Sequence, residues 1–190
     1  WMKFIGKYKI SNINLPLFYY RQHEKSLSSN ESRILYTRSN IYAKYSKGLK
    51  KKLDISIVIP IRGEIIDKNS FAFKKLNNKK ILDYTIESAL SSKKIKKIVL
   101  TSPDKNILNY VKKNYKNRKK ILYLERGLEL GEINVSLDKT FKEALKFLTK
   151  KRINVDALMS LIVDYPFRNF TQIDSAIDVM KIFNVDQVIS

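Results

Sequence analysis

The residues best suited to chemistry lie in a short loop that follows an apolar run. The run covers residues 55–59 and ends at Pro60, and the loop then carries Arg62, Gly63, Lys68 and Asn69. Backbone N–H groups and fixed positive charge can bind phosphate at the end of a buried strand, and glycine lets the backbone approach closely. The segment predicts a triphosphate site, although a strand followed by a basic loop also occurs as plain surface.

The loop must be positioned by a strand, and the sequence from residue 54 predicts a series of them. The continuous apolar run at 55–59 is typical of a strand that is buried on both faces. Further strands are expected at residues 95–100, 121–124, 157–163 and 185–189, with segments of helical spacing between them. Strand–helix alternation predicts an α/β fold with a mostly parallel sheet and helices on both faces. Ligands of such sheets bind at the carboxyl ends of the strands, where this loop falls.

Two helix starts can also be read from the sequence. Ser102 followed by Pro103 is a good start, because a capping side chain precedes a proline in the first turn. The segment from Thr171 to Asp174 has the spacing of a capping box, with Asp in place of Glu.

An ordered series of motifs along residues 54–190 resembles the cytidylyltransferases that activate sialic acids and related acidic sugars. That family begins with a strand and I-P-A-R-G-G-S-K-x-I-P-x-K-N, and continues with Y-T-I-E-x-A, V-V-S-T-D-D, R-P-x-E-L, S-L-D, T-S-P-L-R and S-V-V-S. The matching segments here are residues 59–63 with 68–69, 84–89, 99–104, 126–130, 136–138, 164–168 and 187–190. The strength of the resemblance is the order of the series, not any single motif.

The resemblance implies a Rossmann-like nucleotidyltransferase (GT-A-like) fold and a reaction. A hydroxyl of a sialic-acid-like (nonulosonate) sugar would attack the α-phosphorus of CTP, giving the CMP-sugar and pyrophosphate, usually with Mg²⁺. By family position Arg62 and Lys68 would act on the phosphates as catalytic residues, beside Gly63 and Asn69. Arg126 and Ser136 would hold the cytosine, for which they offer donors and an acceptor. The alternative for Arg126 is a surface arginine after a strand, and Ser136 could equally be a helix N-cap.

Other parts of the match depart from the family. The phosphate loop is two residues shorter, and Glu64 stands where a second glycine is usual. Asp164, Tyr165 and Arg168 fall on the sugar-binding segment, but Ile162 replaces a glutamine there. Asp164 also lies where the related enzymes for the eight-carbon acid Kdo carry an aspartate near metal, so it could hold Mg²⁺ or only cap a loop. A Kdo-type or other sugar nucleotidyltransferase, or a degenerate scaffold domain without activity, therefore stays open as an alternative.

The first 50 residues do not show the alternation of strand and helix patterns found from residue 54 onward. A segment with Tyr19, Tyr20, Arg21 and His23 precedes a helical stretch from Glu31 and resembles the tail of family 2 glycosyltransferases. The expected organisation is therefore a fused glycosyltransferase tail at 1–50, a junction at residues 50–52, and the nucleotide-binding part of a cytidylyltransferase at 54–190. The family's later metal aspartates, its sugar pocket and its homodimer arm would lie beyond residue 190.

Composition narrows the class of partner. The chain has 190 residues, 44% of them hydrophobic, with no cysteine and a formal net charge of +20. This charge favours anionic partners such as nucleotides, acidic lipid or nucleic acid. However, the lysines occur mostly in pairs at turns without interleaved aromatics, which argues against specific nucleic-acid binding. No apolar run has the length of a membrane span. Together with the absence of cysteine, this fits a cytoplasmic protein.

Overall fold

The computed structural model describes residues 30–45, 53–132, 135–183 and 185–189. The chain divides into two compact units, one of residues 52–177 and one that combines 1–51 with 178–190. In the second unit, helix α2 covers Glu31–Tyr45, as the sequence predicts. Its first turn is capped by Asn30, whose side-chain oxygen accepts a hydrogen bond from the Arg33 N–H at 2.9 Å.

A four-stranded parallel sheet forms the centre of the unit of residues 52–177. Its strands are β1 (Ile55–Pro60), β4 (Ile95–Ser102), β5 (Ile121–Glu125) and β6 (Ala157–Ser160), in the order β5-β4-β1-β6. Val58 of β1 is paired with Val99 of β4 on one side and with Ser160 of β6 on the other. The prediction of a parallel sheet with the first strand in its interior is therefore confirmed.

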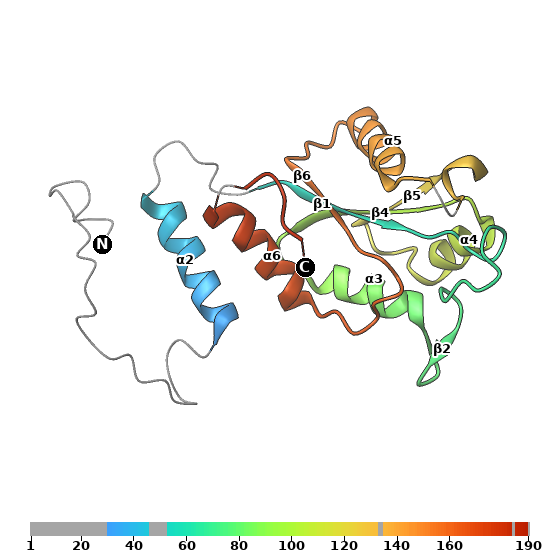
Figure 1. Cartoon of the computed structure of the whole chain (residues 1–190), viewed down its shortest axis with the longest axis horizontal. Helices are drawn as coiled ribbons and strands as arrows, with labels where there is room; N and C mark the ends of the chain where they lie inside the picture. The colour runs from blue at the N-terminus through green and yellow to red at the C-terminus, as the bar shows by residue number, and fades with distance from the viewer. Residues whose placement is uncertain (1–29, 46–52, 133–134, 184, 190) are drawn as a thin grey trace, which may run out of the picture. The chain divides into compact units, whose positions relative to one another are not determined.

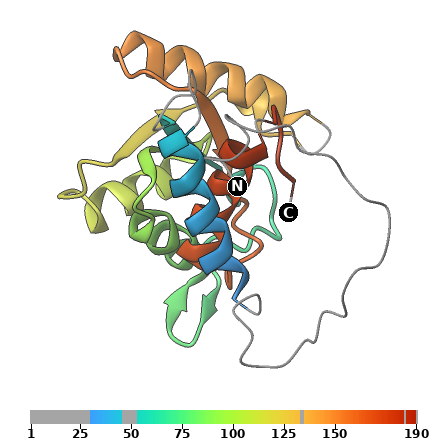
Figure 2. The same cartoon turned by 90° about the vertical axis from the view of Figure 1, so that its left-hand side faces the viewer.

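Helices cover both faces of this sheet, so its central strands β1 and β4 are mostly buried. On one face Val58 and Val99 pack against Ala144 and Leu148 of α5 (Leu137–Lys150). Side chains alternate along a strand, so the fully buried Ile57 and its neighbours on β4 belong to the opposite face. That face is covered by α3 (Ile81–Ser91) and α4 (Lys105–Asn114), and Figures 1 and 2 show them across the sheet from α5.

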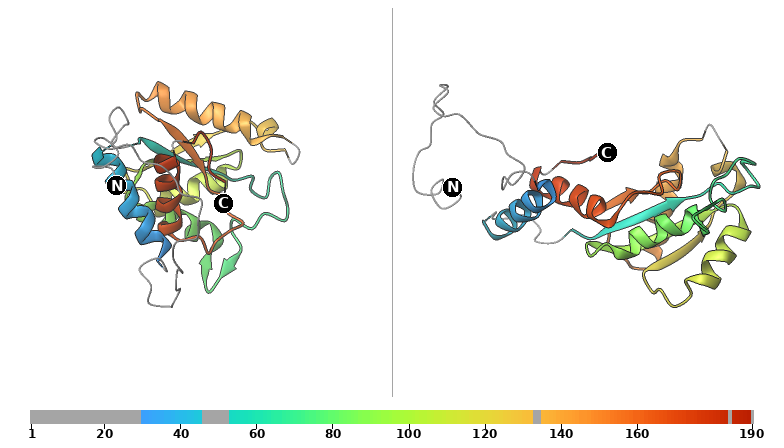
Figure 3. Two further views of the ribbon diagram at one scale, coloured as in Figure 1. Left: turned by 60° about the vertical axis from the view of Figure 1, so that its left-hand side comes forward. Right: turned by 90° about the horizontal axis from the view of Figure 1, so that it is seen from below.

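A small antiparallel hairpin, β2 (Lys75–Leu76) with β3 (Lys79–Lys80), projects from this unit just before α3 (Figure 3). Its turn residues Asn77 and Asn78 have φ values of 49° and 63°. Asparagine tolerates this left-handed region, which two-residue hairpin turns require. The Tyr84 hydroxyl of α3 donates to the Leu76 carbonyl at 2.9 Å and so fixes the hairpin to the helix.

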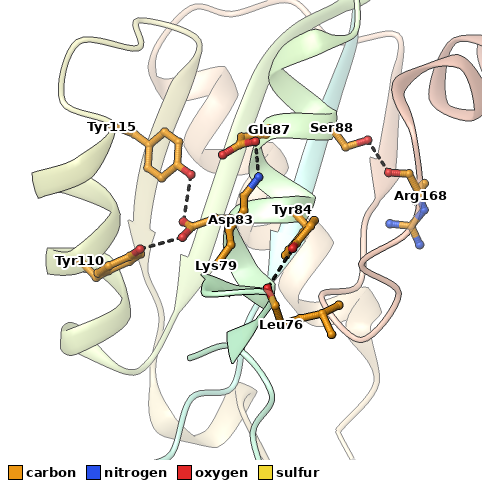
Figure 4. Close-up of polar contacts among 9 residues, drawn as sticks. All are labelled: Leu76, Lys79, Asp83, Tyr84, Glu87, Ser88, Tyr110, Tyr115 and Arg168. Atoms are coloured by element: carbon orange, nitrogen blue, oxygen red, sulfur yellow. Dashed lines mark hydrogen bonds and ion pairs between the residues drawn. The ribbon is translucent and has the colours of Figure 1, made fainter. Parts of the chain in front are cut away.

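Asp83 joins α3 to α4 through two tyrosines. Its carboxylate oxygens accept hydrogen bonds from the hydroxyls of Tyr110 at 2.8 Å and of Tyr115 at 2.9 Å (Figure 4). Burial and the bond to Asp83 raise the pKa of Tyr110 to about 12 and also raise the pKa of Tyr115. Lys80 of the hairpin lies with its ammonium 3.6 Å from the centre of the Tyr110 ring.

Both predicted helix starts are wrong by one or more residues. Ser102 is the last residue of β4, and its hydroxyl accepts from the Asp104 N–H instead of capping a helix. Asp104 caps α4, because its carboxylate accepts from the Asn106 N–H at 2.9 Å. The strand thus runs further than expected, and the cap moves to the next residue that can accept a hydrogen bond.

The predicted capping box of Thr171 and Asp174 is replaced by one that lies two residues earlier. Helix α6 covers Phe170–Phe183. The Asn169 side chain accepts from the Gln172 N–H, and the Gln172 side chain accepts from the Asn169 N–H, both at 3.0 Å. This exchange satisfies two backbone donors at once, which the Thr171 pattern did not reveal.

The expected fifth strand at residues 185–189 is also wrong. None of these five residues is in a strand. The Val185 N–H donates to the Met180 carbonyl at 3.3 Å, so the chain turns back on the end of α6 instead of extending.

Candidate functional site

Three loops meet at the carboxyl edge of the sheet. They follow β1, β4 and β5, and cover residues 61–70, 103–104 and 126–131. A side-chain carbon on Gly131 would lie 3.0 Å from Pro103 and 3.2 Å from Ile66, so the three loops pack directly on one another. The Ile61 N–H donates to the Thr101 carbonyl at 2.9 Å, which extends the pairing of β1 and β4 into the site.

The predicted phosphate loop is folded into two consecutive turns. The Gly63 carbonyl accepts from the N–H groups of Ile66 and Asp67, at 3.3 and 3.0 Å. The Asp67 carboxylate then accepts from the Asn69 N–H at 2.9 Å. Lys68 and Asn69 are exposed on the second turn, whereas Gly63 is buried at the start of the first. The loop therefore presents Lys68 to solvent from a fixed backbone.

Gly63 approaches a protein group closely. Its φ is +76°, and a side-chain carbon added to it would lie 2.5 Å from both Cβ and Oδ2 of Asp104. Only glycine adopts this backbone without strain, and the space beside it is filled by the Asp104 side chain. Contact of Gly63 with phosphate stays a prediction. Sequence reasoning missed Asp104 as the residue that supports the loop, although its place before α4 was a signal.

Arg126 is buried at the centre of this edge. Only 6% of its surface is exposed. One terminal nitrogen donates to the Thr140 hydroxyl of α5 at 2.9 Å, and the other donates to the Ile61 carbonyl at 3.2 Å. The alternative of a surface arginine is therefore wrong. Arg126 connects the start of the phosphate loop to α5.

The charge of Arg126 is destabilised by its surroundings. Burial, with a further contribution from Arg62, lowers its pKa to about 10, and Glu143 opposes this shift. Its Nε is buried and has no hydrogen-bond partner. Unpaired buried donors are costly. This edge also brings two cations, Arg62 and Arg126, close enough to affect each other, and their combined positive charge favours an anionic ligand.

Ser136 lies at the same edge because it begins α5. Its hydroxyl accepts from the Asp138 N–H at 3.2 Å, which confirms the alternative of a helix N-cap. The side chain is exposed, so a cap does not exclude a second role. Contact with a base stays a prediction.

The remaining predicted residues lie in the loop that follows β6. Asp164 is exposed, and so is Tyr165, with 63% of its surface accessible. The Arg168 guanidinium lies 6.0 Å from the centre of the Tyr165 ring, and one terminal nitrogen is buried without a partner. Burial lowers its pKa, while Tyr165 opposes the shift. The Arg168 carbonyl accepts from the Ser88 hydroxyl at 2.7 Å, which ties the loop to α3 (Figure 4).

The described residues offer only part of a metal site. Among them, no three Asp, Glu or His side chains are grouped as a metal ion would need. Mg²⁺ is often held by one or two carboxylates together with substrate phosphates. Asp164 offers one exposed carboxylate after β6, so an Mg²⁺ ion would need oxygens of a bound triphosphate, and its binding stays a prediction. In the same part of the chain no helix is both long and apolar enough to cross a membrane.

Solved structures of other proteins are similar to this chain. The 4-diphosphocytidyl-2C-methyl-D-erythritol synthase of Anaerococcus prevotii matches with a TM-score of 0.51 and 16% identity, over 72% of this chain and 54% of that one. Two others match at 16% identity over 67% of this chain. One is a CMP:2-keto-3-deoxy-manno-octonic acid synthetase complexed with CTP, with a TM-score of 0.49 over 47% of its length. The other is a cytidylyltransferase from Leptospira borgpetersenii, with a TM-score of 0.48 over 48% of its length.

Sequence comparison adds no relative to this picture. No protein-family model matches the chain, and no curated protein matches it. The chain spans about half the length of the solved structures named above. What the comparisons establish is the fold: an α/β fold with a mostly parallel sheet and helices on both faces.

Proposed function

We propose that the unit of residues 52–177 binds CTP at the carboxyl edge of its sheet, as part of a cytidylyltransferase that activates an acidic sugar. The observation that supports this most is Arg126. A buried guanidinium with an unused donor lies beside Arg62, on a fold shared with a 4-diphosphocytidyl-2C-methyl-D-erythritol synthase. The Nε is itself buried, so Arg126 would act on the cytosine through its positive charge, and Arg62 would face the phosphates.

The proposed transfer reaction requires positive charges that are held at fixed positions. In the proposed step a sugar hydroxyl oxygen forms a bond to the α-phosphorus and loses its proton. The bond from that phosphorus to pyrophosphate breaks, and pyrophosphate leaves with the electron pair. Negative charge grows on the phosphoryl oxygens and the leaving group, so preorganised cations stabilise the transition state. Arg62 and Lys68 would supply them, and Mg²⁺ held by the triphosphate and Asp164 would neutralise further phosphate charge.

The identity of the sugar substrate is the more specific part of the proposal. We infer a nonulosonate from the motif series, with Asp164, Tyr165 and Arg168 on the sugar side. The Kdo-type alternative is favoured by one observation, namely that Asp164 precedes Tyr165 and Pro166 where those enzymes carry D-E-P. Both sugars are acids, and Arg168 is a half-buried cation in the loop after β6, whose positive charge would attract a carboxylate. Because the chain spans only part of its structural neighbours, turnover, a homodimer and a cytoplasmic location are proposals about the whole protein.

Nucleotide selectivity tests the proposal. Calorimetry with CTP, UTP, ATP and GTP, with and without Mg²⁺, should give the tightest binding for CTP. Arg62→Ala and Lys68→Ala should each weaken CTP binding on the order of a hundredfold, because charge-assisted bonds to phosphate are lost. Arg62→Lys should also fail, since a point charge does not replace a guanidinium fork. Lys75→Ala, an exposed lysine of the hairpin, is the matched control and should leave binding unchanged.

One further variant and one assay separate the alternatives. Glu64→Gly should improve CTP binding if Glu64 only repels phosphate, and should weaken it only with metal present if Glu64 helps to hold Mg²⁺. Pyrophosphate release with a nonulosonate and with Kdo then distinguishes the two sugars. Equal affinity for all four nucleotides, or full binding by both Arg62→Ala and Lys68→Ala, would mean that this loop is ordinary surface.

A further inference from the structure

The opposite edge of the sheet carries a group of exposed cations that the proposed function does not use. In a parallel sheet, the loops that lead into the strands all lie at the amino edge. The loops before β4, β5 and β6 contain six exposed side chains, which we name the amino-edge cluster: Lys93, Lys116, Arg118, Lys119, Lys151 and Arg152. The cluster is separated from the nucleotide edge by the length of the strands.

Three other lysines join these loops into one surface. The Lys97 ammonium donates to the Lys119 carbonyl, and the Lys120 ammonium donates to the Ser92 carbonyl, both at 2.9 Å. Lys96 donates to the Asn154 carbonyl at 3.4 Å. Each bond connects two of the three loops, or a strand start to a loop. These hydrogen bonds therefore link the loops that carry the amino-edge cluster to one another and to the start of β4.

Three acidic groups among the described residues of this edge already have partners. Asp54 forms an ion pair with Lys96 at 2.6 Å. The Asp156 carboxylate accepts from the Asp54 N–H at 2.9 Å, and the Asp174 carboxylate accepts from the Ser92 hydroxyl at 2.5 Å. These bonds leave the six cations of the cluster in large excess over the acids beside them.

Helix dipoles account for only part of the cluster. Helices α3, α4 and α5 end at this edge, and a helix C-terminus favours a nearby cation. Lys151 is the C-cap residue of α5, and Lys93 follows the C-cap residue of α3, so these two lie at helix ends. In α4 the last turn already holds Lys112 and Lys113, and the other four cations of the cluster lie beyond the helix ends, in the loops.

We propose that the amino-edge cluster is a docking surface for a membrane that contains anionic phospholipid. The loops come from helices on opposite faces of the sheet (Figure 1), so the cations spread in two dimensions, as a plane of headgroups requires. Lysine predominates over arginine, which suits general attraction to phosphate more than bidentate readout. Among the described residues, no exposed large apolar side chain falls within 91–97, 115–120 or 150–156. The contact is thus electrostatic and peripheral.

The same absence of apolar side chains disfavours single-stranded nucleic acid. Such ligands stack their bases on exposed aromatic rings. Tyr115 is the aromatic residue of these three loops, and its hydroxyl is bonded to Asp83. A membrane bound at this edge leaves the carboxyl edge open to a nucleotide and a sugar.

Vesicle flotation tests the proposal on the whole chain. We expect binding to phosphatidylcholine vesicles that contain about 30% phosphatidylglycerol at about 0.1 M salt, and loss of binding at about 0.5 M salt. The triple variant Lys116→Gln, Arg118→Gln, Lys119→Gln should weaken partitioning on the order of a hundredfold. The control variant Lys139→Gln, Lys142→Gln, Lys146→Gln removes the same charge from the exposed side of α5 and should change partitioning by less than about threefold.

Three outcomes would overturn the proposal. They are binding to pure phosphatidylcholine, an equal loss in both triple variants, and tighter binding to duplex or single-stranded nucleic acid than to anionic vesicles at the same salt. If the first triple variant fails to fold, as judged by circular dichroism, the pair Lys93→Gln and Lys151→Gln replaces it. That pair should weaken partitioning on the order of tenfold, and no change would equally count against the surface.

Discussion

Arg126 illustrates how one residue can serve structure and a site together. Its two terminal nitrogens donate hydrogen bonds to the Thr140 hydroxyl and the Ile61 carbonyl, so the residue stabilises the loop that begins the proposed phosphate site. Burial lowers its pKa to about 10, which means that its charge is costly where it stands. An anionic ligand at this edge would reduce this cost, because it would partner the positive charge. The structure therefore connects ligand binding to the stability of the loop.

Gly63 gives the first prediction at this scale. Gly63→Ala should lower the free energy of unfolding by about 2–4 kcal/mol, because a left-handed backbone is unfavourable for alanine and the methyl group would collide with Asp104. Urea denaturation followed by circular dichroism measures the change. Lys68→Ala, an exposed residue of the same loop, should shift stability by less than about 0.5 kcal/mol. A loss below about 0.5 kcal/mol for Gly63→Ala would contradict the observed backbone.

Individual residues show what sequence alone could predict. Ser136 was recognised as a possible N-cap because a short polar side chain before a helical pattern has a local signature. The burial of Arg126 had no such signature. An arginine after a strand reads as surface, and its partners Ile61 and Thr140 are 65 and 14 residues away along the chain. The importance of Gly63 was anticipated, but the side chain of Asp104 that requires it was not.

At the scale of elements, the link between α3 and α4 predicts a dependence on pH. Tyr110 donates to Asp83 only while it is protonated, and its pKa is raised to about 12 in the folded protein. An unfolded tyrosine titrates near 10. The bond therefore contributes its full stability below about pH 10, and this contribution is lost as the pH rises toward about 12.

The test is urea denaturation between about pH 8.5 and 11. Tyr110→Phe should be less stable than the unmodified protein at the lower pH and should lose less stability as the pH rises. Tyr165→Phe, an exposed ring, is the control and should follow the unmodified protein. Parallel curves for Tyr110→Phe and the unmodified protein would show that the bond to Asp83 does not stabilise the fold.

The start of α6 carries a third prediction. Asn169 and Gln172 satisfy each other's backbone N–H groups. Asn169→Ala should therefore cost about 1 kcal/mol of unfolding free energy. Asn109→Ala makes the same chemical change at an exposed position inside α4 and should not destabilise. Equal effects of the two variants in thermal or urea denaturation would argue against the cap.

The elements themselves could largely be predicted, because hydrophobic periodicity is local. The strands β1, β4, β5 and β6 and the helices between them follow directly from apolar runs and helical spacing. One exception is residues 185–189, whose apolar pattern is typical of a strand. A strand needs a neighbour with which to pair, and this segment bonds back to Met180 instead. Pairing partners are a tertiary property that the pattern does not contain.

At the scale of the whole molecule, the two-unit organisation predicts the effect of deletion. We expect a chain that begins at residue 52 to keep CTP binding, because the predicted nucleotide residues all lie in the unit of residues 52–177. Calorimetry measures the affinity, and a cooperative thermal transition verifies that the shortened chain is folded. Loss of CTP binding by a folded, shortened chain would mean that residues 1–51 belong to the site and are not a fused tail.

The order of the strands in the sheet has a consequence for synthesis. β1 lies between β4 and β6, but the Asp54–Asp156 contact beside β6 joins residues 102 positions apart. A ribosome therefore releases β1, β4 and β5 well before β6, and the nascent chain holds an apolar interior strand with one edge unpaired. Unpaired strand edges promote association between chains. Before residue 157 emerges, β1 therefore has no partner on its β6 side, and we predict that slow translation over this interval increases aggregation.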